Sequence, residues 1–418
     1  MKHLDDPLGH LPGALAEIER LGLYRRPAEA DDAIEADALT FCSNDYLGLA
    51  STKAPASASG TGSSRLISGE RSEHRQLERT LANWLGVEDA LVFTSGYAAN
   101  VGTISALAGP SDLLVSDALN HASIIDGARL SKSRVVVTPH LDLAAIDEAL
   151  ASRREPRAWV VVESYYSMDA DGPDLAALRA VSDARHAGLI VDEAHALGVL
   201  GPGGRGRSAE AGVVPDALVG TLGKSLGSQG AFVAGRSILR DWLWNRARSF
   251  VFSTGLAPSA AAAATRALEI LLHSPDLPAY VQRLAERLRT GLRDRVQQNA
   301  FVGAYDHTPL HATANKTHIR GAPLWPPHIG HPQGVPLPRL IGFGHIVPVV
   351  IGKPEDAVRI ADFARARGIH VTAIRPPTVP AGTARIRITV TARHNDEDID
   401  RALDVLHAAL SVVPVVEK

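Results

Sequence analysis

The residues most able to do chemistry in this sequence are a lysine and an acid that each follow a short apolar run. Lys224 lies in D-A-L-V-G-T-L-G-K-S-L-G-S-Q-G, where the apolar run ends at Thr221 and the glycines and serines that follow disfavour a helix. In G-L-I-V-D-E-A-H the run ends at Asp192, and His195 follows three residues later. A lysine that forms an imine and a carboxylate that pairs with a pyridinium nitrogen are the two groups that a pyridoxal phosphate site needs. A lysine on a surface loop is the alternative interpretation of the first stretch.

A candidate phosphate site follows another apolar run, at residues 90–93. In T-S-G-Y-A-A-N, Ser95 can cap a new helix, and Gly96 allows the backbone to approach a ligand closely. The free N–H groups at the start of that helix could bind a phosphate. A capped helix without a ligand is the alternative, because such helix starts are common.

These apolar runs belong to a larger pattern of strands and helices. The runs predicted to be strands are residues 90–93, 113–117, 134–138, 159–163, 189–192, 217–221 and 231–234. Helical patterns, for example at 141–153, lie between some of them. The alternation predicts an α/β fold with a mostly parallel sheet covered on both faces. Ligands on such sheets bind at the carboxyl ends of the strands, where Thr94, Asp192 and Thr221 lie. Glu163 lies at such an end too.

The chain on either side of this pattern is organised differently. Residues 10–26 predict an amphipathic helix that packs against another part of the fold. A short strand at 39–41 then runs into S-N-D-Y-L-G-L, a turn that carries Asn44 and Tyr46. The tail predicts a small α+β domain, with strands at 347–351, 370–374 and 385–391 and helices at 355–367 and 396–410. The expected division of the chain is an N-terminal segment (1–45), a large domain (46–290) and a small C-terminal domain (291–418).

Two stretches have no regular pattern. The glycine-rich residues 57–69 permit sharp bends, and a flexible linker is one interpretation of them. Residues 299–345 contain six histidines and many prolines. His307 and His311 are four residues apart, which makes a metal site conceivable. Nothing in this stretch predicts a helix that would bring the two side chains to one face.

The composition excludes several classes of protein. A length of 418 residues favours more than one domain, and a formal net charge of −3 provides no field that would attract nucleic acid or anionic lipid. Cys42 is the single cysteine, so no intrachain disulfide can form. No uncharged apolar run reaches the ~20 residues that span a bilayer, and the N-terminus lacks the apolar core of a signal peptide. We therefore expect a soluble cytoplasmic protein with no nucleic-acid or membrane partner.

Several motifs together resemble one known family. The matching stretches are N-D-Y-L-G-L, S-G-Y-A-A-N, N-H-A-S, E-S-Y-Y-S-M-D-A-D, V-D-E-A-H-A-L-G, G-T-L-G-K-S-L-G and A-I-R-P-P-T-V-P-A-G-T-A-R-I-R-I-T. Over nearly its whole length the sequence resembles the α-oxoamine synthases, transferases of fold type I that depend on pyridoxal 5'-phosphate (PLP) and condense an amino acid with an acyl thioester. The resemblance implies a large domain with a mostly parallel seven-stranded sheet, a small α+β C-terminal domain, and a homodimer with shared active sites.

The resemblance also assigns roles around the cofactor. Lys224 would bind PLP covalently and later take the Cα proton of the substrate, Asp192 would pair with the ring nitrogen, and His195 would reach the phenolic oxygen. His121, in N-H-A-S, would stack on the ring. Further residues expected beside the ring or the phosphate are Ser167, the backbone N–H groups of Gly96 and Tyr97, Thr221, and Thr254 acting on the neighbouring protomer.

Substrate recognition is expected from the C-terminal part of the chain. The strand R-I-R-I-T places Arg385 and Arg387 on one face, and the resemblance selects Arg387 to bind the carboxylate of the amino acid. Two solvated arginines are the alternative. Asn44 is expected beside the amino acid, and Arg375 and Thr378 on the thioester side. The stretch I-R-P-P-T-V-P-A-G-T-A-R most resembles the biotin-pathway members of the family, which implies L-alanine and a pimeloyl thioester carried by coenzyme A or a carrier protein.

Other activities are compatible with parts of the sequence. Within the family they are those of glycine C-acetyltransferase, 5-aminolevulinate synthase and a serine palmitoyltransferase type of enzyme. A DEAH-type ATPase is a rival from another class, because D-E-A-H is a known box and V-G-T-L-G-K-S approaches a P-loop. The spacing argues against it, since a P-loop needs a glycine where Leu218 stands. The chain departs from the family pattern in a shortened segment between Leu49 and Gly60, in Ser63 where glycine is usual, and in a longer 299–345 stretch.

Overall fold

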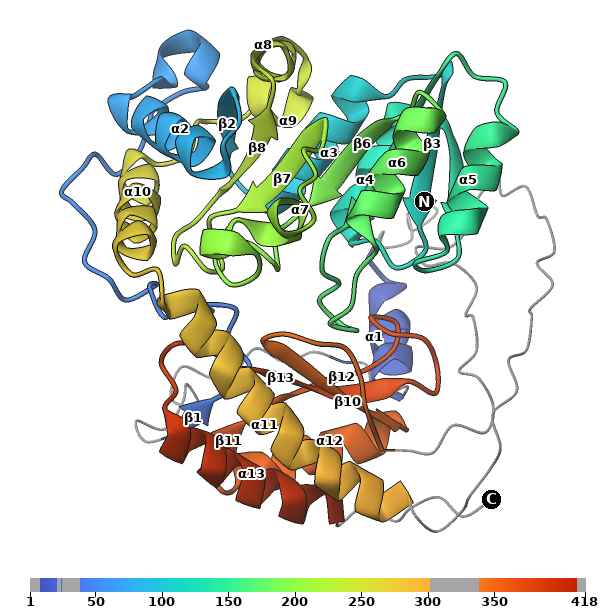
Figure 1. The fold of residues 1–418 in the computed structure, drawn as a ribbon, viewed down its shortest axis with the longest axis vertical. Coiled ribbons are helices and arrows are strands. Elements are labelled where there is room, and N and C mark those ends of the chain that lie inside the picture. Colours follow the sequence, from blue (N-terminus) through green and yellow to red (C-terminus); the bar gives the residue numbers. More distant parts are fainter. Residues whose placement is uncertain (1–7, 21–23, 25–37, 301–337, 412–418) are drawn as a thin grey trace, which may run out of the picture.

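A seven-stranded sheet forms the larger part of the fold. The computed structural model describes residues 8–20, 24, 38–300 and 338–411 (Figure 1). The strand order in the sheet is β2-β8-β7-β6-β5-β3-β4. The strands are β2 (Asp89–Phe93), β3 (Asp112–Asp117), β4 (Arg134–Thr138), β5 (Arg157–Glu163), β6 (Gly188–Asp192), β7 (Ala217–Thr221) and β8 (Ala231–Gly235). The predicted strands of the large sheet are confirmed, with boundaries that differ by at most two residues.

All strands of this sheet except β8 run in one direction. β3 to β7 pair in parallel, whereas β8 is antiparallel to both β7 and β2. The carboxyl ends of β2, β5, β6 and β7 therefore lie along one edge of the sheet. This edge carries Thr94, Glu163, Asp192 and Thr221, so the expected mostly parallel α/β sheet is confirmed.

Helices cover both faces of the sheet, because successive side chains of a strand point to opposite faces. Val161 of β5 packs on one face in a cluster with α3 (Gly96–Leu107), α4 (Ala122–Ser131), α8 (Ser237–Arg246) and α9 (Arg248–Val251). Val160 and Val162 pack on the other face with α5 (Leu143–Ala151) and α6 (Leu175–Ala184). On that same side, α2 (Ser72–Leu85) and α10 (Pro258–His273) cover β2 and β8. Because these strands are buried on both faces, their sequences are continuous apolar runs, as in W-V-V-V-E.

A smaller sheet and three helices form the C-terminal part of the fold, below the large sheet in Figure 1. The strand order is β12-β13-β10-β9. The elements are β9 (Arg339–Leu340), β10 (Ile346–Gly352), β12 (Thr372–Ile374), β13 (Ala384–Thr389), α11 (Leu277–Ala300), α12 (Pro354–Arg365) and α13 (Asp396–Ser411). The helix α11 is continuous through residue 290, where the sequence places a boundary, and the domain boundaries stay a prediction.

The single strand expected at 370–374 is wrong. The chain there forms β11 (Ile369–His370) and then β12, with Val371 between them. β11 pairs in parallel with β1 (Leu39–Thr40), so the N-terminal strand joins the C-terminal part of the fold. Phe41 packs in the same core as α11 and α13. Strand pairing across more than 300 residues of sequence decides this arrangement, and no local pattern encodes it.

The N-terminal helix also differs from expectation. It is described as α1 over Leu11–Arg20, and none of its side chains is buried. Leu11, Leu15 and Ile18 are exposed. The expected packing against another part of the fold is therefore not seen in the described chain.

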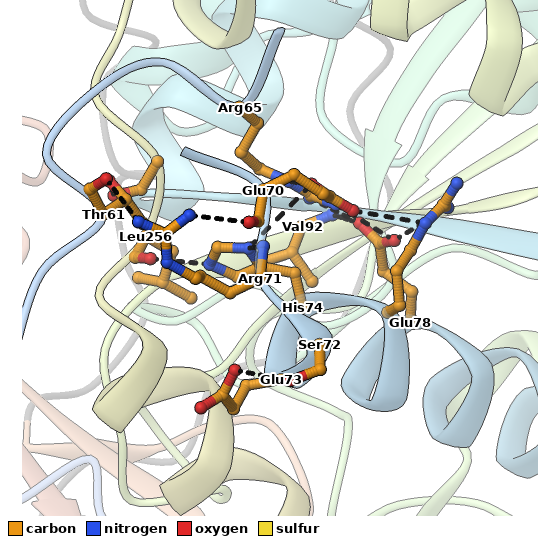
Figure 2. Close-up of polar contacts among 12 residues, drawn as sticks. Thr61, Arg65, Glu70, Arg71, Ser72, Glu73, His74, Glu78, Val92 and Leu256 are labelled. Atoms are coloured by element: carbon orange, nitrogen blue, oxygen red, sulfur yellow. Dashed lines mark hydrogen bonds and ion pairs between the residues drawn. The ribbon is translucent and has the colours of Figure 1, made fainter. Parts of the chain in front are cut away.

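The glycine-rich residues 57–69 are not a flexible linker. Arg65–Gly69 forms a π-helical turn, η2, and Arg65 is only 3% exposed. Its guanidinium lies 2.6 Å from Glu78 Oε1 and 2.5 Å from Glu70 Oε2 (Figure 2). Glu78 Oε1 also accepts a hydrogen bond from Val92 N of β2 at 3.0 Å. A buried ion pair therefore ties this segment to α2 and to the edge of the large sheet.

Replacing Glu78 by alanine is expected to destabilise the protein by about 3 kcal/mol, the lower end of the range for breaking a buried ion pair, because Arg65 keeps Glu70 as a partner. The thermal midpoint, followed by circular dichroism, should fall by several degrees. Asp396→Ala is the matched control, since it breaks an exposed pair with Arg283 and should leave the midpoint near that of the wild type. Equal shifts in the two variants would contradict this role of Glu78.

Candidate active site

The turn after β7 holds Lys224 at the carboxyl edge of the large sheet. A hydrogen bond from Leu222 N to Gly230 O, at 2.9 Å, closes the turn. Gly227 has a φ of +54°, and an added Cβ there would lie 2.4 Å from Ala50 N, so a larger residue would be strained. The lysine is therefore fixed on a non-helical turn that leads into β8, as the glycines and serines predict.

Lys224 contacts a histidine and lies near two carboxyl groups from neighbouring strands. Its Nζ lies 2.7 Å from His195 Nε2. Loss of hydration lowers the pKa of the Lys224 amine to about 8, although the negative charges of Asp192 and Glu163 oppose this change. The positive charge of Arg387 lowers the pKa further. A substantial fraction of the amine is therefore neutral near pH 7 to 8, and the neutral amine is the form that attacks a carbonyl group.

Asp192 is held in one orientation at the end of β6. It is 6% exposed, and its Oδ2 accepts a hydrogen bond from Asn100 Nδ2 at 2.7 Å. Its Oδ1 accepts from Ala194 N at 2.8 Å. Asn100 lies on α3 and ends the motif S-G-Y-A-A-N, but no role was predicted for it from the sequence. The sequence signal for a role at the site is its position four residues after Gly96, which places its amide one helical turn from the helix start.

His121 stands at the start of α4 and is exposed. Its backbone N–H donates to Glu163 Oε1 at 2.6 Å, and its Nδ1 lies 2.7 Å from Ser123 Oγ. These contacts fix the ring while leaving it open to a planar ligand. Burial and the charge of Asp192 raise the pKa of Glu163 to about 8, against the opposing effect of Lys224. Glu163 is therefore mostly protonated at neutral pH, which limits the negative charge around the site.

The start of α3 provides the expected anion site. Ser95 is confirmed as the N-cap, since its Oγ accepts from Ala98 N at 3.1 Å. The first N–H groups of a helix have no partner within the helix, and those of Gly96 and Tyr97 lie at this end. An added Cβ on Gly96 would meet no atom within 4 Å, so there is open space in front of it. Thr221, at the end of β7, accepts a hydrogen bond on Oγ1 from Gly223 N at 3.2 Å.

The residues just before η2 hold the stretch F-S-T-G-L, which carries Thr254. Gly255 N donates to Ser63 O at 3.0 Å, and Thr61 Oγ1 donates to Gly255 O at 3.2 Å. His74 of α2 contacts the next carbonyl of this stretch through Nε2. Thr254 lines a small hollow together with Thr94. Its reach into a neighbouring protomer stays a prediction.

The smaller sheet contributes a buried arginine to the site. Arg387 is 5% exposed and donates to Ser167 O at 2.8 Å, to Thr389 Oγ1 at 3.1 Å and to Asn44 Oδ1 at 3.0 Å. Its neighbour Arg385 forms an ion pair with a carboxylate, but within the described residues no carboxylate lies within 4.0 Å of Arg387. A buried guanidinium without a counter-ion has capacity for an anionic ligand. Two solvated arginines, the alternative interpretation, are therefore wrong.

The remaining expected substrate residues lie further along the same sheet. Arg375 and Thr378 follow β12, and Thr378 N donates to Arg375 O at 3.1 Å. Ile374, the last residue of β12, pairs with Arg385, which reaches the carboxylate of Asp169. The role of Arg375 and Thr378 on the thioester side stays a prediction.

Two aromatic residues border the site without having been assigned a role from the sequence. Tyr46 is completely buried, and its hydroxyl lies 2.6 Å from His195 Nδ1. His345 is also completely buried, and its ring centroid lies 4.2 Å from that of Tyr46 in an edge-on contact. The other histidines of the 299–345 stretch fall outside the described residues. Among the described residues, no group of three or more side chains could hold a metal ion.

The side chains present fit PLP. A partly neutral lysine amine suits its aldehyde, a fixed and buried carboxylate suits its ring nitrogen, and the start of α3 suits its phosphate. The lysine, the carboxylate and the helix start meet at the carboxyl edge of a mostly parallel sheet, where ligands of such folds bind. Fold and site thus define a PLP-dependent enzyme of fold type I.

Comparison with known proteins identifies the family to which the chain belongs. The model of the aminotransferase class I and II family matches residues 36–313 and 333–406, and the chain belongs to this family. It is 40% identical to an 8-amino-7-oxononanoate synthase from Mycolicibacterium smegmatis, over 95% of this chain and 96% of that protein. The DEAH-type ATPase is therefore excluded.

Solved structures support the fold and the cofactor. A serine palmitoyltransferase from Sphingomonas wittichii is 29% identical, with a TM-score of 0.81 over 98% of this chain and 100% of that one. A second serine palmitoyltransferase structure, which holds PLP, is 26% identical, with a TM-score of 0.80 over the same shares of the two chains.

The lowered pKa of Lys224 leads to a direct test in the cofactor-free protein. Pulse acetylation at a series of pH values, read by peptide mass spectrometry, should label Lys224 with a midpoint near pH 8, because only the neutral amine reacts. In Asp192→Asn the midpoint should move lower still, since a negative charge that raises this pKa has been removed. A midpoint at about 10.4, the value for a solvated lysine, would contradict the burial argument.

Proposed function

We propose that the protein joins L-alanine to a pimeloyl thioester in the biotin pathway, the reaction of an 8-amino-7-oxononanoate synthase. Cα of alanine loses a proton and forms a bond to the acyl carbon, and the thiol leaves with a proton. The alanine carboxyl group then departs as carbon dioxide, and a proton takes its place on Cα. The observation that carries the proposal is Arg387, a buried cation without a carboxylate partner among the described residues, on the same hydrogen-bonded network as Lys224. An amine-reactive lysine and a carboxylate-binding arginine in one site suit an amino acid. The choice of alanine and a pimeloyl donor is supported by the relative from M. smegmatis.

PLP, when bound, supplies an aldehyde that condenses with an amine and a protonated ring that accepts the electron pair released at Cα. Lys224 would hold the aldehyde carbon, and Asp192, fixed by Asn100, would keep the ring nitrogen protonated. Gly96 and Tyr97 would bind the phosphate through their N–H groups, with Thr221 beside them. His121, whose ring is exposed at the site, would cover one face of the ring.

The residues of the chain also assign the proton transfer at the substrate. Arg387 would hold the carboxylate of alanine in a charge-assisted pair. Asn44 and the backbone carbonyl of Ser167, which both accept hydrogen bonds from Arg387, lie beside it. Lys224, freed when the amino acid takes its place on the cofactor, would remove the Cα proton. Its lowered pKa leaves a substantial fraction of the amine neutral near pH 7 to 8, and this fraction can act as the base. Holding the carboxylate on one side of Cα leaves the proton on the side of the lysine.

A homodimer with shared sites is part of the proposal. Phe252 and Ile67 are 72% and 80% exposed and lie on the two segments that are hydrogen-bonded to each other around Thr254. A second copy of the chain would cover these side chains and bring its own Thr254 to the neighbouring phosphate. No helix of the described residues is long and apolar enough to cross a membrane. A cytoplasmic location fits a chain with one cysteine.

The substrate assignment predicts the outcome of a matrix assay. Purified holoenzyme would be mixed with L-alanine, glycine or L-serine and with pimeloyl, acetyl, succinyl or palmitoyl coenzyme A, and free thiol and carbon dioxide would be followed. The pair of L-alanine and the pimeloyl donor should give the highest kcat/KM. Preference for glycine with an acetyl or succinyl donor would reject this reaction while leaving the family membership intact. The absence of thiol and carbon dioxide release with every pair would indicate a carrier-protein donor.

The role of Arg387 predicts a selective defect in Arg387→Lys. The substitution keeps the charge but loses the two-pronged geometry that suits a carboxylate. The KM for alanine should rise about 10- to 100-fold, the range for losing a hydrogen bond to a charged group, while the KM for the thioester stays within about two-fold. An equal rise in both constants would indicate a general distortion instead.

A further inference from the structure

A buried chain of hydrogen bonds joins the lysine to the arginine. Lys224 Nζ lies 2.7 Å from His195 Nε2, and the opposite ring atom, His195 Nδ1, lies 2.6 Å from the Tyr46 hydroxyl. The Tyr46 hydroxyl in turn lies 3.2 Å from Asn44 Oδ1. The same oxygen of Asn44 accepts from Arg387 Nη2 at 3.0 Å. Tyr46 is the central link between the base and the carboxylate-binding group.

The Tyr46 side chain is held firmly in this place. It is completely buried, and its backbone accepts a hydrogen bond from Ala392 N at 2.9 Å. The ring of His345 packs edge-on against it at 4.2 Å, and Arg289 holds the backbone around His345 by donating to Ile346 O at 2.8 Å. Burial raises the pKa of Tyr46 to about 12, so its hydroxyl keeps its single proton at neutral pH.

One hydroxyl proton can serve only one of the two neighbours of Tyr46 at a time. Burial lowers the pKa of His195 well below its usual value, and the positive charges of Lys224 and Arg387 lower it further. The ring is therefore neutral, with a proton on one nitrogen only. The position of that proton depends on where Tyr46 donates.

The chain has two consistent proton arrangements. If Tyr46 donates to His195 Nδ1, the proton of His195 is on Nε2 and points to the lone pair of a neutral Lys224. If Tyr46 donates to Asn44 Oδ1, His195 Nδ1 donates to Tyr46, and Nε2 accepts from Lys224. Only the second arrangement suits a lysine that has taken up a proton, because an ammonium group has no lone pair.

We propose that Tyr46 is a positioning residue that couples a carboxylate bound at Arg387 to the proton state of Lys224, through the tautomer of His195. A carboxylate that takes up Arg387 Nη2 withdraws this donor from Asn44 Oδ1, which then accepts more strongly from Tyr46. The second arrangement becomes favoured, and the pKa of the Lys224 amine in the cofactor-free protein rises when a carboxylate is bound. This inference rests on the proposed function, since it takes Arg387 as the carboxylate site.

The first test uses propionate, which is alanine without its amino group, on the cofactor-free full-length protein. The acetylation midpoint of Lys224 is measured with and without propionate in the wild type and in Tyr46→Phe, which keeps the ring against His345 and removes the hydroxyl. Propionate should raise the midpoint in both proteins through its charge. The rise should be larger in the wild type by roughly half a pH unit or more, the effect of about one hydrogen bond.

The other charged and titratable groups that face Lys224 are unchanged in this comparison. They are Asp192 of β6, Glu163 of β5, Arg387 of β13, and the rings of His121, His195 and His345. Tyr165→Phe is the matched control, because it also loses a buried hydroxyl beside His345 but one that donates to Phe343 O, outside the chain of hydrogen bonds. It should behave like the wild type.

A second test needs no substitution in the chain of hydrogen bonds. Nitrogen-15 chemical shifts of His195 in histidine-labelled wild-type protein, assigned with His195→Gln, report which ring nitrogen carries the proton. At a pH just above the midpoint measured for Lys224 without propionate, where the amine is mostly neutral, propionate should move that proton from Nε2 to Nδ1. An unchanged tautomer with propionate bound, or equal midpoint shifts in the wild type and Tyr46→Phe, would overturn the inference and leave the proposed function standing. Failure of propionate to bind the wild type in calorimetry would overturn the assignment of Arg387 and the inference with it.

Discussion

The site depends on one constraint, the burial of an amine at the edge where parallel strands end. Lys224 has lost most of its water there and is close to Asp192, Glu163 and Arg387, whose opposing charges leave its pKa near 8. A fully solvated lysine would be protonated and inert toward a carbonyl group, whereas a lysine beside carboxylates alone would be protonated more firmly still. The parallel sheet brings the two carboxyl groups close to Lys224, because the carboxyl ends of β5, β6 and β7 lie at one edge.

The rest of the molecule keeps this edge rigid. Asn100 of α3 fixes Asp192, and the backbone of His121 fixes Glu163, so both carboxyl groups act from set positions. The residues that lead into η2, where Arg65 forms an ion pair with Glu78, hold the stretch that carries Thr254 (Figure 2). The glycine-rich residues 57–69, whose composition is typical of a flexible linker, are thus fixed by contacts with the rest of the fold.

The smaller sheet completes the site from the other side. Arg387 arrives from β13 and contacts Asn44 and the backbone of Ser167, which come from distant parts of the sequence. The contact joins the two sheets where an amino acid would bind. The pairing of the N-terminal strand β1 with β11 carries the loop with Asn44 to this arginine.

The sequence by itself determined much of this protein. Apolar runs ending in Thr94, Asp192 and Thr221 predicted the strands and the edge where chemistry occurs, because a buried strand must be apolar along its length and its polar residues collect at its end. The glycines and serines around Lys224 likewise predicted a turn rather than a helix. Local composition encodes these features, so no partner from elsewhere in the chain was needed to find them.

Only the tertiary structure decided the partnerships. The role of Asn100, the chain from Lys224 through Tyr46, and the division of residues 369–374 between two sheets all depend on residues far apart in sequence. The proton state of the lysine is likewise a property of its burial and of the charges around it. Hydrogen bonds and electrostatic fields act through space, so a pattern along the chain cannot specify them until the fold brings their members together.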